Sequence, residues 1–265
     1  MKNIKKIVAV MLAAMMMLAL VGCNKKAADD NKLVVATSAD FPPYEYVEGG
    51  EFVGIDMDIA RAIADKLGME LEIQNVDFDS VIAGVTTGKY QMGMSGITAN
   101  DERRQNVNFT DSYATTNQVI IVKEGSFIQS MDNFYTVDET GTTVTVPGLM
   151  VGVQASTTGD IYVSDSVENG GVGADHTTQF KTGADAIQAL VTDKVQAVII
   201  DSEPAKAFVA ANPGLVILES PYVTEEYAIA VNKDNEELLA KVNGALQELI
   251  ADGTVQQIVD KYIKA

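Results

Sequence analysis

The chain has 265 residues, 47% of them hydrophobic, and a formal charge of −18 at pH 7. This length allows one large domain or two modest ones with cores of their own. The acidic balance argues against binding nucleic acid, or an anionic membrane surface, through a basic patch. The chain has a single Cys and a single His, which excludes an intrachain disulfide, a Cys-based metal cluster and a multi-histidine metal site, and we expect no cofactor and no metal.

The first 22 residues have the pattern of a secretion signal. Three lysines precede an apolar run over 7–21 that is shorter than a membrane-spanning helix needs. Leu20-Val21-Gly22-Cys23 resembles the lipobox of bacterial lipoproteins, in which the Cys is acylated. We therefore expect a lipoprotein signal peptide over 1–22, lipidation at Cys23 and a tether over 23–32. The mature protein is then extracytoplasmic and lipid-anchored to a bacterial membrane, at the cell surface or in the periplasm; the alternative is an ordinary signal peptide with an incidental Cys.

From residue 33 the sequence alternates between strands and helices. Strands are predicted over 33–37, 69–73 and 91–95, and helices over 56–67 and 79–87, with a small hairpin over 47–52. This β-α-β-α-β order predicts a parallel, doubly wound sheet with right-handed crossovers. Ligands of such sheets bind outside the carboxyl ends of the strands.

The stretch over 96–104 follows the third of these strands. Thr98 or Asn100 is suited to cap a helix there, but Arg103 and Arg104 are disfavoured beside the positive end of a helix dipole. The chain has only one other Arg. The stretch is therefore either an anion-binding turn or a solvated helix start with a local Asp–Arg pair.

The second half repeats the alternation. Strands are predicted over 118–122, 150–153, 195–200 and 227–231, and helices over 161–167, 184–191, 235–251 and 254–263, with an irregular hairpin over 124–147. Thr157 or Thr158 either caps a helix or binds an anion, and Asp201 or Ser202 either caps the next helix or, for Asp201, faces a cationic ligand group. Two connecting strands, near 113–121 and 222–230, predict a hinged pair of lobes.

Five segments in order resemble the polar amino-acid-binding proteins of ABC importers, the extracellular solute-binding proteins of family 3. They are Ala36–Glu45, Val53–Asp58, Gly96–Arg103, Val151–Gly159 and Val195–Asp201, and Gly244–Tyr262 is similar to the closing helix pair of the family. The resemblance implies the α/β, two-lobed periplasmic-binding-protein type II (Venus flytrap) fold. Each lobe is then a mostly parallel sheet flanked by helices, with two hinge strands between the lobes. We expect lobe 1 over 33–114 and 226–265, and lobe 2 over 115–225.

The resemblance also implies an α-amino-acid site between the lobes. Arg103 matches the residue that grips the α-carboxylate, Asp201 the acid that takes the α-ammonium, and Phe41 the aromatic ring that packs over the ligand side chain. The other positions expected to bind ligand are Gly96, Thr98, Thr158, Ser38, Ser95, Thr157 and Tyr44. An arginine suits this role because its planar fork binds a carboxylate bidentately.

The chain also departs from the pattern of the family. Ser38 stands where relatives that bind basic amino acids or glutamine carry Asp, which argues against a strictly cationic ligand unless other pocket acids substitute. Ser156 stands where Gly is usual, Gln154 and Ile200 replace polar residues of some relatives, and the segment 126–147 is longer than usual. These changes affect the side-chain specificity and leave the α-amino-acid anchor intact.

We therefore expect a monomeric binding lipoprotein that captures an α-amino acid and delivers it to the transmembrane subunits of an ABC permease, with no catalytic activity and no nucleic-acid partner. One alternative is an enzyme on the same fold, resembling cyclohexadienyl or arogenate dehydratase, although no carboxylate pair at catalytic spacing is evident. The other is the ligand-sensing domain of a receptor.

Overall fold

A computed structural model describes residues 31–218 and 224–263. The predicted signal peptide, Cys23 and most of the tether lie outside the described residues. The described residues from Leu33 onward belong to one compact unit. Across the two described ranges, no helix combines the length and the apolarity that crossing a membrane requires.

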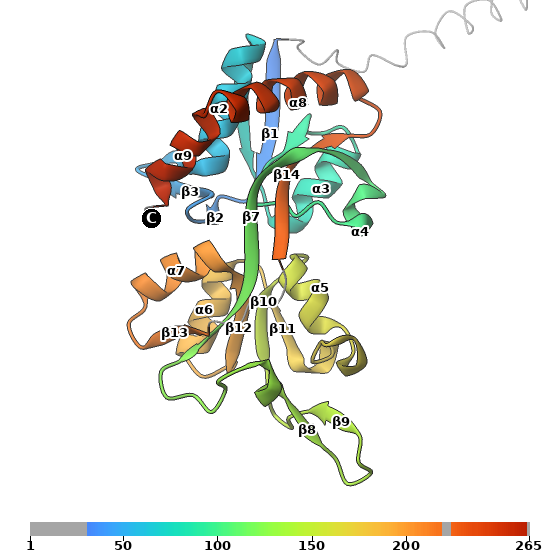
Figure 1. The fold of residues 1–265 in the computed structure, drawn as a ribbon, viewed down its shortest axis with the longest axis vertical. Helices are drawn as coiled ribbons and strands as arrows, with labels where there is room; N and C mark the ends of the chain where they lie inside the picture. The colour runs from blue at the N-terminus through green and yellow to red at the C-terminus, as the bar shows by residue number, and fades with distance from the viewer. Residues whose placement is uncertain (1–30, 219–223, 264–265) are drawn as a thin grey trace, which may run out of the picture. The chain divides into compact units, whose positions relative to one another are not determined.

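A nine-stranded sheet runs through this unit in the order β11-β10-β12-β7-β14-β6-β1-β5, with β13 paired to β7 (Figure 1). The strands are β1 (Lys32–Thr37), β5 (Glu70–Asn75), β6 (Met92–Gly93), β7 (Val107–Lys123), β10 (Val151–Gln154), β11 (Thr177–Phe180), β12 (Ala197–Asp201), β13 (Leu215–Leu218) and β14 (Thr224–Asn232). The pairs β1–β6, β10–β11 and β10–β12 are parallel. The predicted parallel sheets with crossover helices are thereby confirmed.

The strands β7 and β14 connect the two lobes. They pair antiparallel with each other over Val107–Asn117, and the far end of β7, from Gln118, pairs with β12. At its other end β14 pairs with β6. The strand predicted near 113–121 is thus part of one 17-residue strand shared by both halves of the sheet. The two-lobed fold is confirmed, and the residue boundaries of the lobes stay a prediction.

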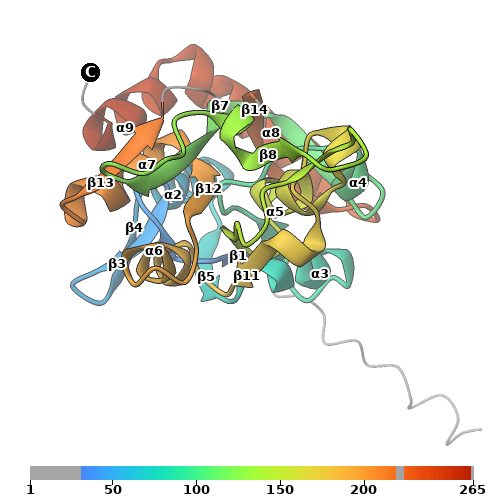
Figure 2. The same ribbon diagram turned by 90° about the horizontal axis from the view of Figure 1, so that it is seen from below.

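Four helices cover the half of the sheet that contains β1, β5 and β6. They are α2 (Ile55–Leu67), α3 (Phe78–Thr86), α8 (Glu236–Ala251) and α9 (Thr254–Tyr262). The helix predicted over 56–67 forms as α2, whose apolar side chains Ile55, Ile59 and Ile63 are fully buried, and Gly68 ends it in the left-handed conformation at φ 66°. Helices α8 and α9 pack beside α2, whereas α3 packs against β6 and β14. In the view of Figure 2, α8 and α9 lie toward the top and α3 lies at the lower right.

The other half of the sheet is covered by α5 (Thr158–Ser164), α6 (Gly183–Val191) and α7 (Ser202–Ala211). Helix α5 begins three residues before the predicted start at residue 161, because the Thr157 hydroxyl accepts a hydrogen bond from the Asp160 amide at 3.2 Å and so caps the helix. Thr157 is therefore the capping residue that the sequence left undecided.

The remaining elements are short. The segment after β7 holds η1 (Met131–Phe134) and the predicted hairpin, formed by β8 (Tyr135–Val137) and β9 (Thr143–Thr145). Near the start of the chain, β2 (Asp40–Phe41), β3 (Glu45–Glu48) and β4 (Glu51–Val53) form a small antiparallel sheet that confirms the predicted hairpin at 47–52. Two further turns are η2 (Val167–Asn169) and η3 (Ala174–His176), and α4 (Asp101–Arg104) is a single helical turn.

Candidate functional site

A cavity lies where the carboxyl ends of β1, β6, β10 and β12 meet. It is lined by nine of the ten residues predicted to bind ligand: Ser38, Phe41, Ser95, Gly96, Thr98, Arg103, Thr157, Thr158 and Asp201. The topology explains this convergence, because the crevice of a doubly wound sheet forms at the carboxyl ends of its strands. Their roles toward a ligand stay predictions.

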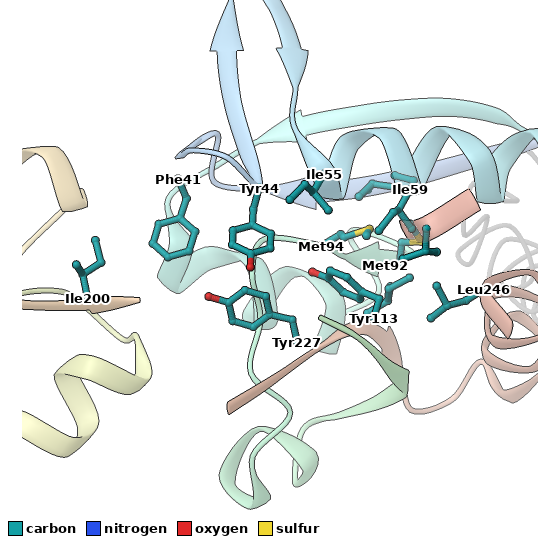
Figure 3. Close-up of a cluster of buried hydrophobic side chains, with 14 of the residues drawn as sticks. Phe41, Tyr44, Ile55, Ile59, Met92, Met94, Tyr113, Ile200, Tyr227 and Leu246 are labelled. Atoms are coloured by element: carbon teal, nitrogen blue, oxygen red, sulfur yellow. The ribbon is translucent and has the colours of Figure 1, made fainter. Parts of the chain in front are cut away.

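Tyr44 is the predicted site residue that does not line this cavity. It is 2% exposed and its ring meets the edge of the Tyr227 ring at a centroid distance of 4.9 Å. Figure 3 shows Tyr44, Tyr113 and Tyr227 gathered between Phe41 and the buried methionines. Tyr44 therefore supports the cavity wall from the core.

Arg103 is held at the cavity by main-chain groups. Its guanidinium donates to the Thr98 carbonyl and to the Ser156 carbonyl, both at 3.0 Å, and lies over the Phe78 ring at 5.4 Å. The Asn100 side chain caps α4 by accepting a hydrogen bond from the Arg103 amide at 2.8 Å. The dipole argument made from the sequence is wrong, because α4 has only four residues and Arg103 lies in its last turn.

The charge of Arg103 is buried without an ion pair. Arg103 is 8% exposed. Among residues 31–218 and 224–263, no carboxylate lies within ion-pair distance of its guanidinium. Burial lowers the pKa of Arg103, while the charges of Glu225 and Asp201 act in the opposite direction. An arginine stays protonated under these conditions, so the site is electrostatically suited to an added anion.

Asp201 also lines the cavity. It occupies the N-cap position of α7, but its side chain makes no capping hydrogen bond, so the capping interpretation of this carboxylate is not supported. Its Oδ1 instead accepts a hydrogen bond from the Tyr227 hydroxyl at 2.6 Å. Burial, and then the nearby charge of Glu225, raise the pKa of Asp201 to about 6. The carboxylate thus lacks a cation, which a ligand ammonium would supply.

Thr158 connects the cavity to a buried acid that the sequence analysis missed. Its hydroxyl donates to Glu225 Oε2 at 2.8 Å, and the Gln118 side chain donates to the same oxygen at 2.8 Å. Glu225 is 4% exposed and lies on β14, whereas Gln118 lies on β7. The two connecting strands and the start of α5 are therefore tied together directly behind the site.

Four further residues line the cavity without having been predicted: Asp40, Glu45, Phe78 and Gln154. Burial raises the pKa of Asp40 to about 6, although hydrogen bonds from Ser38 and Gln154 oppose that shift. The signal was available for Asp40 and Glu45, because both fall in the segment Ala36–Glu45 that resembles the family motif. Phe78 starts α3 and offered no such signal.

Gly96 is required by its surroundings. It has φ 51°, and a Cβ at this position would lie 3.1 Å from the Phe41 ring and 3.4 Å from the Tyr227 ring. Its amide donates to Asp56 Oδ2 at 2.9 Å. The amide is thus directed toward a buried carboxylate behind the cavity, and Gly96 shapes the wall through its missing side chain.

Comparison with known proteins identifies the family of this chain. A profile of the bacterial extracellular solute-binding proteins, family 3, matches residues 33–265. The arginine-binding extracellular protein ArtP of Bacillus subtilis is 32% identical over 97% of this chain and 98% of its own length. A probable histidine-binding protein of Neisseria gonorrhoeae is 29% identical over 98% of this chain and 96% of its own.

Among solved structures, the arginine-, lysine-, histidine-binding protein ArtJ of Geobacillus stearothermophilus superposes with a TM-score of 0.78 at 34% identity, covering 88% of this chain and 96% of that one. These relatives are described as binding proteins and not as dehydratases. The profile match covers nearly the whole described chain and includes every cavity residue named above. The chain belongs to the bacterial extracellular solute-binding proteins of family 3.

Proposed function

We propose that this protein captures an α-amino acid with a cationic side chain outside the cytoplasm and delivers it to an ABC permease. The observation that carries the proposal is the charge of the cavity wall, which holds one cation, Arg103, and three carboxyl groups, Asp40, Glu45 and Asp201. A zwitterion uses Arg103 and Asp201. Two acids then remain for a positive side chain.

The α-amino-acid anchor rests on two buried, uncompensated charges at one cavity. Arg103 presents a planar guanidinium suited to a carboxylate, and Asp201 a carboxylate suited to an ammonium. Each of these buried charges gains a partner when a zwitterion binds, which offsets part of its desolvation.

The cationic class rests on Asp40 and on the relatives. Ser38 lacks the acid that relatives binding basic amino acids carry, but Asp40 lies two residues further on and accepts a hydrogen bond from the Ser38 hydroxyl at 3.3 Å. The rings of Phe41 and Phe78 also line the cavity, and aromatic faces attract guanidinium and ammonium groups. The relatives named above are described as binding arginine, histidine, or arginine, lysine and histidine.

The two-lobed fold supports delivery to a permease. Closure of the lobes around a ligand changes the surface that a permease contacts, so that loaded and empty forms are distinguished. Lipidation at Cys23 would keep the protein beside the membrane. A Cys23→Ser variant should move from the membrane fraction to the soluble fraction, with Ser38→Ala, which keeps the signal intact, as its matched control.

Calorimetric titration tests the ligand class. Arginine, lysine and histidine are expected to bind, with glutamine and glutamate much weaker. In a thermal-shift assay, a ligand at 100 times its dissociation constant should stabilise the protein by about 2.7 kcal/mol. Asp40→Asn should weaken arginine more than glutamine, whereas Asp175→Asn, at an exposed position away from the cavity, should change neither. Preference for a neutral or acidic amino acid would overturn the proposed class.

A further inference from the structure

Two carboxyl groups lie fully buried behind Ser95 and Gly96, in the turn that follows β6. Glu45, on β3, accepts a hydrogen bond from the Ser95 hydroxyl at 2.8 Å. Asp56, in the first turn of α2, accepts hydrogen bonds on Oδ2 from the Gly96 amide at 2.9 Å and from the Tyr113 hydroxyl at 2.8 Å. These contacts account for one oxygen of each carboxyl group.

The other two oxygens face a buried space without a donor. Glu45 Oε2 and Asp56 Oδ1 are both inaccessible and accept no hydrogen bond from any described residue. The two residues are neighbours, because the Asp56 amide donates to the carbonyl of Tyr44, the residue before Glu45, at 2.9 Å, and the charge of Asp56, after burial itself, acts to raise the pKa of Glu45. A proton on one of these two oxygens would supply the hydrogen-bond donor that the buried pair otherwise lacks.

The surroundings favour that proton. The titratable groups that face the pair are Tyr44 and Tyr113, whose pKa values burial raises above 10, and the acid Asp40. None of these is a cation that could stabilise two carboxylates. Burial raises the pKa of Glu45 well above its usual value and that of Asp56 to about 6. Two adjacent carboxylates cannot both ionise cheaply in such a site.

The pair is connected to ligand binding at two points. Glu45 itself lines the cavity. The Ser95 hydroxyl that donates to Glu45 also accepts a hydrogen bond from the Ser38 amide at 3.0 Å, so the loop after β1 and the turn after β6 meet at this pair. A change of charge on Glu45 is therefore felt directly at the wall of the cavity.

We propose that Glu45 and Asp56 share one proton in the ligand-free protein and that a cationic ligand side chain displaces it. The O–H bond of the Glu45 carboxyl breaks, the proton leaves to solvent, and the positive side chain compensates the second negative charge in its place. This inference rests on the proposed cationic ligand. It assigns to Glu45 a role in specificity and to Asp56 a positioning role behind it.

Infrared spectroscopy of the ligand-free protein tests the shared proton. At pH 7 the C=O stretch of a buried, protonated carboxylic acid is expected. This band should be absent in Glu45→Gln and weakened or shifted in Asp56→Asn. It should be unchanged in the control Glu226→Gln, because Glu226 is an exposed residue of β14. Thermal unfolding of each variant verifies folding. Wild-type protein without this band would overturn the shared proton.

Calorimetry in two buffers of different ionisation enthalpy tests the displacement. At pH 8, Asp40, Asp56 and Asp201 are already ionised, because their pKa values are about 6. Binding of arginine at this pH should therefore release about one proton per ligand, the proton of Glu45. Glu45→Gln should bind arginine more weakly and release none, because its amide imitates the protonated acid. Glu226→Gln should behave as the wild type.

The outcomes separate this inference from the proposed function. If arginine binds with a heat that is independent of the buffer, the displacement is wrong and the cationic ligand stands. If no cationic amino acid binds, the proposed ligand class and the displacement both fail, and the infrared band alone still decides whether the pair shares a proton.

Discussion

The Arg103 guanidinium donates through Nη2 to the main-chain carbonyl of Ser156 at 3.0 Å. Arg103 follows β6 in one half of the sheet, whereas Ser156 follows β10 in the other, so this hydrogen bond joins the two lobes. The cation assigned to the ligand carboxylate thus also contacts the opposite lobe. In the proposed function, one side chain therefore serves both the ligand carboxylate and the contact between the lobes.

Arg103→Ala should remove binding without removing the fold. Loss of one partner from a buried charge pair costs about 2–5 kcal/mol, or roughly 30- to 5,000-fold in affinity. Arg103→Lys keeps the charge but loses the planar fork, and we expect an intermediate loss. Titration calorimetry with arginine measures both. Arg104→Ala is the matched control, because Arg104 is exposed and lies over Phe109 outside the cavity. Equal affinity in wild type and Arg103→Ala would remove Arg103 from the site.

Tyr227→Phe should weaken binding of every α-amino acid to a similar extent. The lost hydroxyl orients Asp201 through a 2.6 Å hydrogen bond, and a hydrogen bond to a charged group contributes about 1.5–3 kcal/mol. Asp201→Asn should have a larger effect, since it removes the charge that faces the ammonium. Competition titrations with two ligands of different side chain test this. Tyr90→Phe, buried away from the cavity, should bind normally, and a selective effect on one ligand would contradict the assignment of Asp201 to the α-ammonium.

Ser156→Gly should stabilise the protein by about 0.5–1 kcal/mol, because a left-handed conformation costs a non-glycine residue roughly 1–2 kcal/mol. Ser156 has φ 65°, which explains why Gly is usual at this position. The Ser156 amide donates to Asp160 Oδ2, and the Ser156 carbonyl accepts a hydrogen bond from Arg103. Both groups belong to the main chain, so Gly retains these hydrogen bonds.

Urea denaturation measures this change in the free energy of unfolding. The matched control is Ser166→Gly, where φ is −65° and glycine only adds freedom to the unfolded chain. That variant should be less stable than the wild type. A destabilised Ser156→Gly would show that the serine side chain contributes more than its backbone conformation costs.

Stability and affinity should depend on pH with opposite signs. Burial raises the pKa of Asp40, Asp56 and Asp201 from 3.8 to about 6, so between these values the native protein binds more protons than the unfolded chain. The free energy of unfolding of the ligand-free protein should therefore rise as the pH falls from about 7 to 4. Affinity for arginine should fall over the same range, because Asp40 and Asp201 must be ionised to bind cations.

Thermal unfolding from pH 8 to pH 5, with and without arginine, tests these signs together. In Asp40→Asn and Asp201→Asn the slope of the ligand-free stability should be smaller. Ligand-free protein that loses stability between pH 7 and pH 5 would show that these acids are paired rather than merely buried.

Local patterns in the sequence were sufficient for most elements. The helix over 56–67, for example, was predicted from a 3.6-residue apolar period, and α2 forms there over Ile55–Leu67. The same local logic was wrong at Arg103, because it could not show that α4 lasts a single turn. It also divided β7, whose continuity depends on pairing with β12 at one end and β14 at the other.

Motifs in the sequence alone were sufficient to predict the family and the alternation of strands and helices. They also predicted nine residues that line one cavity. These signals are local and occur in a fixed order along the chain. Only the tertiary structure decided which partners the buried acids at and behind this cavity have. Glu225 and Gln118 are 107 residues apart and are joined by strand pairing, and Glu45 and Asp56 are joined by the packing of a hairpin against α2. Burial and proximity set the charge state of such groups, and both arise from the folded chain rather than from neighbours in sequence.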